Sequence, residues 1–281
     1  MIDKSKFSGM NYYYRNYPIE YFFQSLKENE IENFELWTCT HHFEIDNLHY
    51  QNVKDFKKKF VSNELNIICL TPEQSNPKPY SLAAKTPKLI NKARNYFKNA
   101  IDAANELESP IVSMNSGWDF YSENPSEAWK RSTDLMRELV EYAELRGVKM
   151  TLEALQPEES HLVNTINELV AYLKVVDHPN LFINLDLGAM ARSHETINQY
   201  FETFKERIIH CHFVDGNPTG HLAWGDGTRN MESDLREFEK NSYQGYFTFE
   251  FANSTYFLNP KAVDKNVMNA IKKINRRNEN E

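Results

Sequence analysis

Short hydrophobic runs alternate with longer amphipathic stretches along the whole chain, and eight of these runs have the composition of β-strands. The stretches between them predict helices at 19–29, at 126–146, at 260–275 and from Thr86, where Thr86 can cap a helix that begins at Pro87. Repeated strand–helix units predict an α/β fold, with residues 1–281 as a single domain, one (β/α)8 TIM barrel. The expected strands are 9–13, 33–37, 66–70, 110–114, 149–155, 181–186, 208–213 and 246–251.

Each of the last four runs has one apolar face and a second face that ends in an acidic or imidazole side chain. In the last run, alternation along a strand places Phe247, Phe249 and Phe251 on one face and Thr248 and Glu250 on the other. A buried carboxylate without a partner is costly, so such positions commonly hold a metal ion or a catalytic group. Four such residues on consecutive strands favour a barrel over an open doubly wound sheet. They are Glu153, Asp186, His212 and Glu250.

Composition and charge narrow the classes of function. The chain has 281 residues and a net charge of −8, which argues against nucleic acid or an anionic membrane as a partner. It shows no apolar stretch of membrane-spanning length, no secretory signal and no glycine-rich phosphate loop, so a cytoplasmic location is expected. Cys39, Cys69 and Cys211 form no CxxC pair and are expected to be buried, reduced thiols.

The segments that follow the expected strands are rich in aromatic and polar residues, a mixture that suits a small polyhydroxylated ligand. Trp37 and Trp118 are equally compatible with packing roles, and at least one of His41 and His42 is expected to be an exposed loop residue. We expect Glu35 and His210 to be buried, hydrogen-bonded residues of the barrel interior. The candidate substrate contacts are His42, Glu73, Tyr80, Trp118, Glu159 and His221.

Three carboxylates and one imidazole form an oxygen-rich set that suits a divalent ion, with Mn²⁺ expected and Mg²⁺, Co²⁺ or Zn²⁺ as alternatives. Such an ion can stabilise the enediolate formed when a proton leaves the carbon beside a carbonyl. Two glutamates could remove that proton and return it to the opposite face, which is epimerisation. The same groups could run an aldose–ketose isomerisation, a dehydration or, without a metal, a glycoside hydrolysis.

The strand-end residues and several longer stretches resemble the xylose isomerase-like TIM barrel family of sugar isomerases and epimerases. The chain is most similar there to fructoselysine 3-epimerases, in TPE at 71–73, LEALQPEES at 152–160 and IIHCHFVD at 208–215. The resemblance implies that Glu153 and Glu250 are both metal ligands and the acid–base pair, and that Glu159 contacts the substrate or tunes Glu153. It also implies a homo-oligomer, a dimer or a tetramer.

Two positions depart from the pattern of epimerases that act on free ketohexoses. Those proteins typically carry a histidine where this chain has Ala189 and an arginine where it has Pro218. These differences weaken a tagatose or psicose substrate, although both remain alternatives. The sequence therefore predicts an isomerase, a metal-dependent 3-epimerase of a ketose or ketose-amine such as fructoselysine or psicoselysine. Glu73 is a candidate contact for the lysine ammonium.

Overall fold

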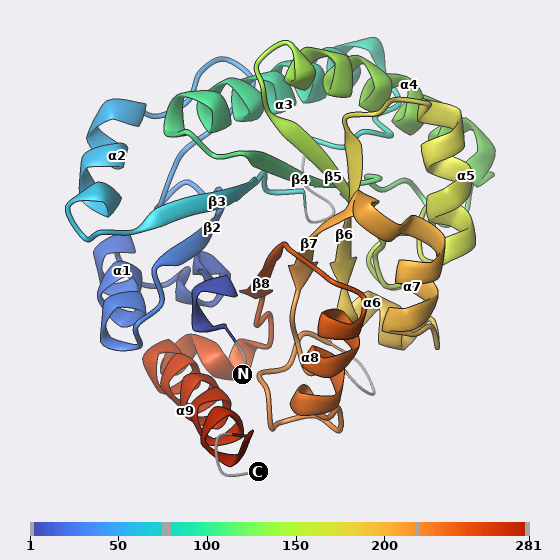
Figure 1. Ribbon diagram of the computed structural model, residues 1–281. Helices are drawn as coiled ribbons and strands as arrows, with labels where there is room; N and C mark the ends of the chain where they lie inside the picture. Colours follow the sequence, from blue (N-terminus) through green and yellow to red (C-terminus); the bar gives the residue numbers. More distant parts are fainter. Residues whose placement is uncertain (1–2, 75–79, 217–219, 279–281) are drawn as a thin grey trace.

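Eight parallel strands close into a barrel in sequence order, with helices outside it (Figure 1). The computed structural model describes residues 3–74, 80–216 and 220–278, so Pro218 lies outside the described residues. β1 pairs with both β2 and β8, and this pairing closes the barrel and confirms the predicted fold class. The strands are β1 Phe7–Met10, β2 Asn33–Trp37, β3 Asn66–Thr71, β4 Ile111–Asn115, β5 Lys149–Glu153, β6 Leu181–Asp186, β7 Ile208–His212 and β8 Tyr246–Phe249.

The helices begin where the sequence offers capping side chains. The Thr86 side chain accepts a hydrogen bond from the backbone of α3, which has Pro87 as its first residue. Thr165 and Glu168 form a capping box at the start of α5. The helices are α1 Ile19–Glu28, α2 Val53–Val61, α3 Pro87–Leu107, α4 Pro125–Glu144, α5 Ile166–Val176, α6 Leu187–Arg192, α7 Ile197–Phe204, α8 Met231–Lys240 and α9 Pro260–Asn278.

The first strand differs from its predicted position, since it covers Phe7–Met10 rather than residues 9–13. It ends because the Asn11 side chain bonds the edge of β2: Oδ1 accepts from the Trp37 backbone N–H at 2.7 Å and Nδ2 donates to the Trp37 carbonyl at 2.8 Å. The chain then turns into a short 3₁₀ helix, η2, Asn11–Tyr14. Tyr12 therefore lies beyond the strand end, where a barrel builds its site.

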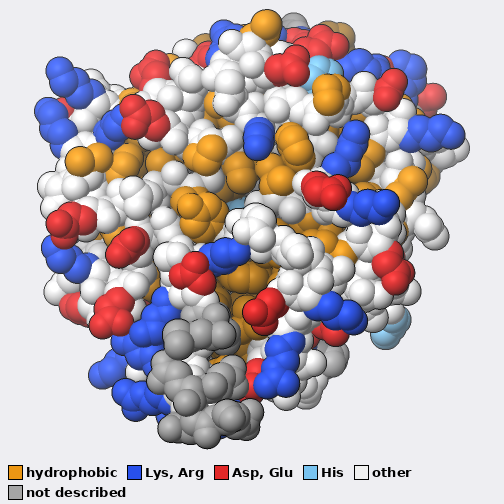
Figure 2. All heavy atoms as spheres, viewed as in Figure 1, with side chains coloured by type: hydrophobic (Ala, Val, Ile, Leu, Met, Phe, Trp, Pro, Cys, Tyr) orange, Lys and Arg blue, Asp and Glu red, His pale blue; other side chains and the backbone are white. Residues whose placement is uncertain are grey.

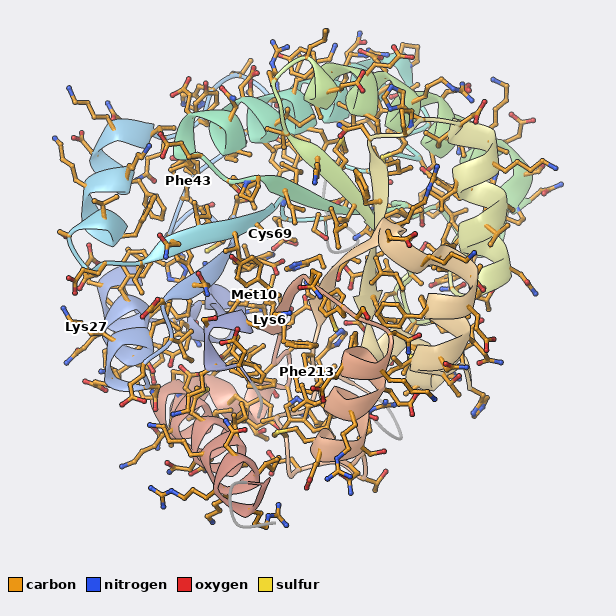
Figure 3. All side chains as sticks on the ribbon, in the orientation of Figure 1. Lys6, Met10, Lys27, Phe43, Cys69 and Phe213 are labelled. Carbon is orange, nitrogen blue, oxygen red and sulfur yellow. The ribbon has the colours of Figure 1, made fainter. Side chains whose placement is uncertain are left out.

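Apolar side chains fill the space between the barrel and its helices, whereas the barrel interior is partly polar. Glu35, Asn184, His210 and His212 are fully buried, and Glu35 of β2 meets His210 and His212 of β7 across the interior. Figure 3 shows Met10 and Cys69 near the middle of the barrel and Lys27 on the outer side of α1. A polar interior of this kind needs hydrogen-bond partners.

Acidic and basic side chains are interspersed on the face seen in Figure 2, with hydrophobic side chains between the elements near its centre. Within the described residues, no helix is long and apolar enough to cross a membrane. Cys69 and Cys211 are buried as predicted, but Cys39 is only half-buried because it lies in the loop after β2.

Candidate metal centre and active site

The four predicted ligands converge at the carboxyl ends of β5 to β8. Glu153, Asp186 and His212 are the last residues of β5, β6 and β7, and Glu250 directly follows β8. The parallel register places Asp186 opposite His212. The four residues offer ligand atoms that all lie within 4.8 Å of one another. This is the end of the barrel where TIM barrels carry their active sites.

One ring nitrogen of His212 faces three carboxylates. Nδ1 lies 2.8 Å from Glu250 Oε2, 3.1 Å from Glu153 Oε1 and 3.6 Å from Asp186 Oδ2. The other nitrogen, Nε2, lies 3.1 Å from Glu35 Oε1. A neutral imidazole has one N–H, and with this proton donated to Glu35 the Nδ1 lone pair faces the three carboxylates. A cation between them would satisfy all four groups, so the residues fit a divalent metal ion.

The charges of the cluster point to the same conclusion. Burial raises the pKa of Glu153 to about 8, and the neighbouring His212 opposes this shift. Burial also raises the pKa of Asp186, but His221 and His212 outweigh it and hold that pKa well below its ordinary value. Buried carboxylates this close together repel unless a positive charge lies among them. A divalent ion would supply that charge.

Asp186 divides its two oxygens between two tasks. It caps α6, since Oδ1 accepts a hydrogen bond from the backbone N–H of Ala189. Oδ2 faces the cluster and lies 3.0 Å from Nε2 of His221. That ring also lies 3.3 Å from Glu250 Oε2. His221, predicted as a substrate contact, is therefore brought against two of the metal-ligand candidates.

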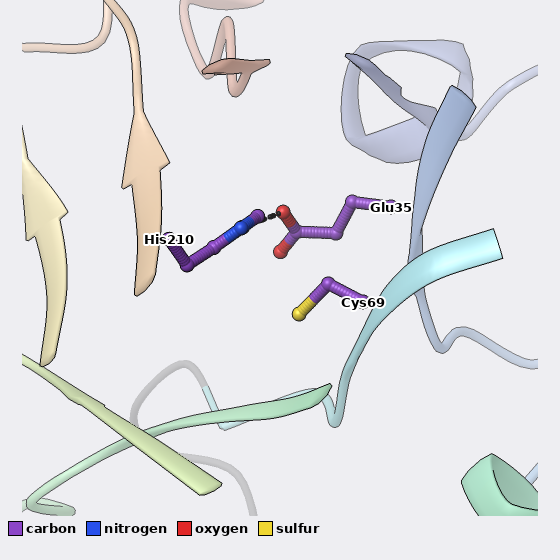
Figure 4. A group of neighbouring side chains, drawn as sticks. All are labelled: Glu35, Cys69 and His210. Atoms are coloured by element: carbon purple, nitrogen blue, oxygen red, sulfur yellow. Dashed lines mark hydrogen bonds and ion pairs between the residues drawn. The ribbon is translucent and has the colours of Figure 1, made fainter. Parts of the chain in front are cut away.

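A second group of side chains lies deeper in the barrel, formed by Glu35, Cys69 and His210 (Figure 4). His210 Nε2 lies 2.6 Å from Glu35 Oε2, and the Thr71 hydroxyl donates to Glu35 Oε1. The prediction that Glu35 and His210 are hydrogen-bonded interior residues is confirmed. Burial raises the pKa of the Cys69 thiol well above its ordinary value, which keeps it a weak ligand. Glu35 links this group to the upper cluster, because its Oε1 lies 3.1 Å from His212 Nε2.

A cavity of about 140 Å³ opens above the cluster. Four of the predicted substrate contacts, Glu73, Trp118, Glu159 and His221, line it together with Glu153 and Glu250. Trp37 and Tyr12 add aromatic faces. Tyr12 was missed because the sequence pattern placed it inside the first strand. The only available signal was the run of three tyrosines at 12–14, which is equally typical of packing.

The other two predicted contacts lie elsewhere. Tyr80 stacks on Tyr96, with ring centroids 4.0 Å apart, and lines an adjoining cavity. His42 is buried, with Nε2 2.8 Å from the Tyr17 carbonyl and Nδ1 2.6 Å from Asn11 Nδ2, and it is outside the lining of both cavities. A substrate contact for His42 therefore stays a prediction. His41 is exposed, as expected for at least one of the pair.

A closed (β/α)8 barrel with a carboxylate–histidine cluster at the ends of its last four strands defines a class of TIM barrel proteins with a candidate metal site at the usual active-site face. The profile of the xylose isomerase-like TIM barrel family matches residues 23–274. The chain belongs to this family.

The chain is also similar to individual named proteins. Fructoselysine 3-epimerase of Shigella flexneri is 29% identical over 244 residues, which cover 86% of this chain and 87% of that protein. Among solved structures, an L-ribulose 3-epimerase aligns with a TM-score of 0.80 at 16% identity, over 98% of this chain and 97% of that one. D-psicose 3-epimerase with D-tagatose from Clostridium cellulolyticum H10 aligns with a TM-score of 0.77 at 17% identity, over 95% and 97%. At these identities the structures show the shared fold. All three proteins are named as 3-epimerases, which belong to the isomerases, the enzyme class predicted here.

Proposed function

We propose that this protein is a divalent-metal-dependent epimerase that inverts C3 of a ketose or ketose-amine of the fructoselysine type. The observation that carries the proposal is the placement of two glutamates, Glu153 and Glu250, in one cavity beside a cluster that fits a metal ion. The similarity to a fructoselysine 3-epimerase over most of both chains supports the substrate class.

In this proposal the two glutamates exchange protons with C3. One carboxylate removes the proton from one face of the carbon, and the other acid returns a proton to the opposite face. They come from β5 and from the end of β8, so they reach the cavity from different parts of the barrel wall. A carboxylate can take a proton and give it back, which is the role that both glutamates have in this exchange.

A divalent ion held by Glu153, Asp186, His212 and Glu250 would supply stabilisation of the negative charge that develops on the substrate oxygen. We propose Mn²⁺ because the ligand set is rich in oxygen, with Mg²⁺, Co²⁺ and Zn²⁺ as alternatives. We further propose one domain over residues 1–281, a dimer or tetramer, and a cytoplasmic location.

The remaining walls of the cavity suit a sugar. The rings of Tyr12, Trp37 and Trp118 can pack on C–H groups, while Glu159 and His221 can bind hydroxyls. Burial raises the pKa of Glu159, and the nearby His221 opposes this rise. These groups would orient the carbon between the two glutamates rather than react themselves.

Proton exchange in D₂O tests the proposal. Purified protein with Mn²⁺ is incubated with fructoselysine, fructose and tagatose, and NMR follows the loss of the H3 signal and the identity of the product. We expect exchange at C3 that EDTA abolishes and a product with inverted C3. A carbonyl that moves along the chain would instead identify an aldose–ketose isomerase, and the absence of exchange on all three sugars would refute the epimerase.

A further inference from the structure

A second cavity, here called the outer cavity, adjoins the cavity above the metal-ligand cluster, which is here called the reaction cavity. It has a volume of about 350 Å³, against about 140 Å³ for the reaction cavity, and the two share Trp37 and Glu73 in their walls. Small-molecule sites commonly measure about 300–1,000 Å³, so the reaction cavity alone is small and the two together fall in the usual range. This arrangement suits a substrate with a second part that extends beyond the reacting sugar.

Arg15 lines the outer cavity, and aromatic rings hold its guanidinium in place. The Cζ atom lies 3.8 Å from the ring centre of Tyr12, 4.6 Å from that of Phe257 and 5.1 Å from that of Trp37. Nε donates to the Tyr12 carbonyl at 3.1 Å. Stacking of this kind fixes the plane of the guanidinium while its outer N–H groups remain for another partner.

The charge of Arg15 is uncompensated within the described part of the chain. No carboxylate there forms an ion pair with it, and Nη2 is buried without a hydrogen-bond partner. Most of the other arginines described are paired, as Arg131 is with Asp119 and Arg146 with Asp102. A buried guanidinium nitrogen without an acceptor is costly, and an anionic group on a ligand would remove that cost.

We propose that Arg15 is an anion subsite that binds the carboxylate at the far end of a ketose-amine, where an amino acid is joined to the sugar through its side-chain amine. The inference rests on the function proposed above and adds the residue that selects the substrate. Arg15 stacks on Tyr12 and Trp37, which line the reaction cavity, but Arg15 itself lines only the outer cavity. Arg15 therefore meets the tail and not the reacting carbon. Glu73, in the wall common to both cavities, is the counterpart for the ammonium of the same amino acid.

Two substrates that differ only in the carboxylate test this subsite. Fructoselysine carries it, and the ketose-amine in which the same 1-deoxyfructosyl group is joined to 1,5-diaminopentane has the same chain length without it. With wild-type protein and Mn²⁺, we expect KM for H3 exchange to be about tenfold to a hundredfold lower for fructoselysine, as for other hydrogen bonds to charged groups. Arg15→Gln removes this preference by raising KM for fructoselysine alone, with kcat little changed, and Arg15→Lys restores part of it.

Arg236→Gln is the matched control, because Arg236 is an exposed arginine of α8 that is paired with Glu232. We expect it to leave both KM values unchanged. Equal KM values of the two ketose-amines with wild-type protein would overturn the subsite, and so would an equal loss on both in Arg15→Gln. The wild-type comparison decides alone if Arg15→Gln does not fold.

Two further substrates extend the test. Fructose 6-phosphate distinguishes the sources of negative charge, and a lower KM for it than for fructoselysine would overturn the assignment to a carboxylate. Fructose without a tail distinguishes the two proposals. Metal-dependent exchange on fructose with no preference for the carboxylate would reject the subsite alone, whereas no exchange on any sugar would reject the epimerase itself.

Discussion

The two halves of the barrel contribute different things to one site. β5 to β8 end in the four candidate metal ligands, two of which are also the proposed acid and base. β1 to β4 and the segments after them contribute Glu35 below the cluster and the walls formed by Tyr12, Trp37 and Glu73. The second half supplies reactive groups on rigid strand ends, and the first half supports them and shapes the space for the substrate.

Replacing an acid–base residue in the second half should have the largest effect. Glu153→Gln and Glu250→Gln keep a polar side chain of similar size but cannot exchange a proton as a carboxylate does. We expect kcat for H3 exchange to fall by about 10²–10⁴-fold or more, the usual contribution of general acid–base catalysis. Glu158→Gln is the control, since Glu158 is an exposed neighbour paired with Arg192. Activity of either variant within a few-fold of wild type would contradict the assignment.

Metal binding should stabilise the protein through the same half. Added Mn²⁺ should raise the temperature of thermal unfolding. The free energy of unfolding should increase by about 2.7 kcal/mol when the ion is at 100 times its Kd. Asp186→Asn should lose most of this shift, because it removes the negative charge that faces His212. An equal Mn²⁺-dependent shift in the variant would show that the ion binds elsewhere.

Glu35 connects the two halves of the barrel, and replacing it should weaken metal binding while all four candidate ligands remain in the sequence. Glu35→Gln takes away the carboxylate that accepts from His212 Nε2 and lies against His210. Loss of such an outer partner typically lowers metal affinity about 10- to 100-fold. Calorimetric titration with Mn²⁺ measures it, with Cys69→Ala as the neighbouring control. Unchanged affinity in Glu35→Gln would mean that His212 is oriented without Glu35.

The smallest effect concerns a buried histidine of the first half. Burial lowers the pKa of His42 from its ordinary 6.5, and the hydrogen bond to the Tyr17 carbonyl offsets this shift only in part. The unfolded chain therefore binds a proton more readily than the folded one, and His42 should reduce stability as the pH falls below about 6.5. Denaturant unfolding between pH 5 and 8 should show a shallower acid loss in His42→Gln than in wild type. An identical pH profile would mean that other groups account for the loss.

The sequence predicted the second half better than the first for a physical reason. In β8, strict alternation of apolar and polar residues reveals which face carries Glu250, and the same logic places Glu153, Asp186 and His212. β1 could not be placed because Asn11 ends it through a side-chain contact with Trp37, 26 positions away in the sequence. The outer cavity joins Arg15, Glu73 and Tyr80 from separate loops, and no local pattern records that proximity. Long-range contacts of this kind appear only once the chain is folded.

The divided carboxylate of Asp186 has a mechanical consequence. Because Oδ1 is held by the first turn of α6, the side chain is oriented before any ion arrives, and only Oδ2 is turned toward the cluster. Little rotational freedom is then left to lose on binding, which is preorganisation of a ligand by the helix that follows it. The start of α6 thus fixes the orientation of one candidate metal ligand. A substitution that loosens that turn would weaken ion binding although it lies outside the cluster.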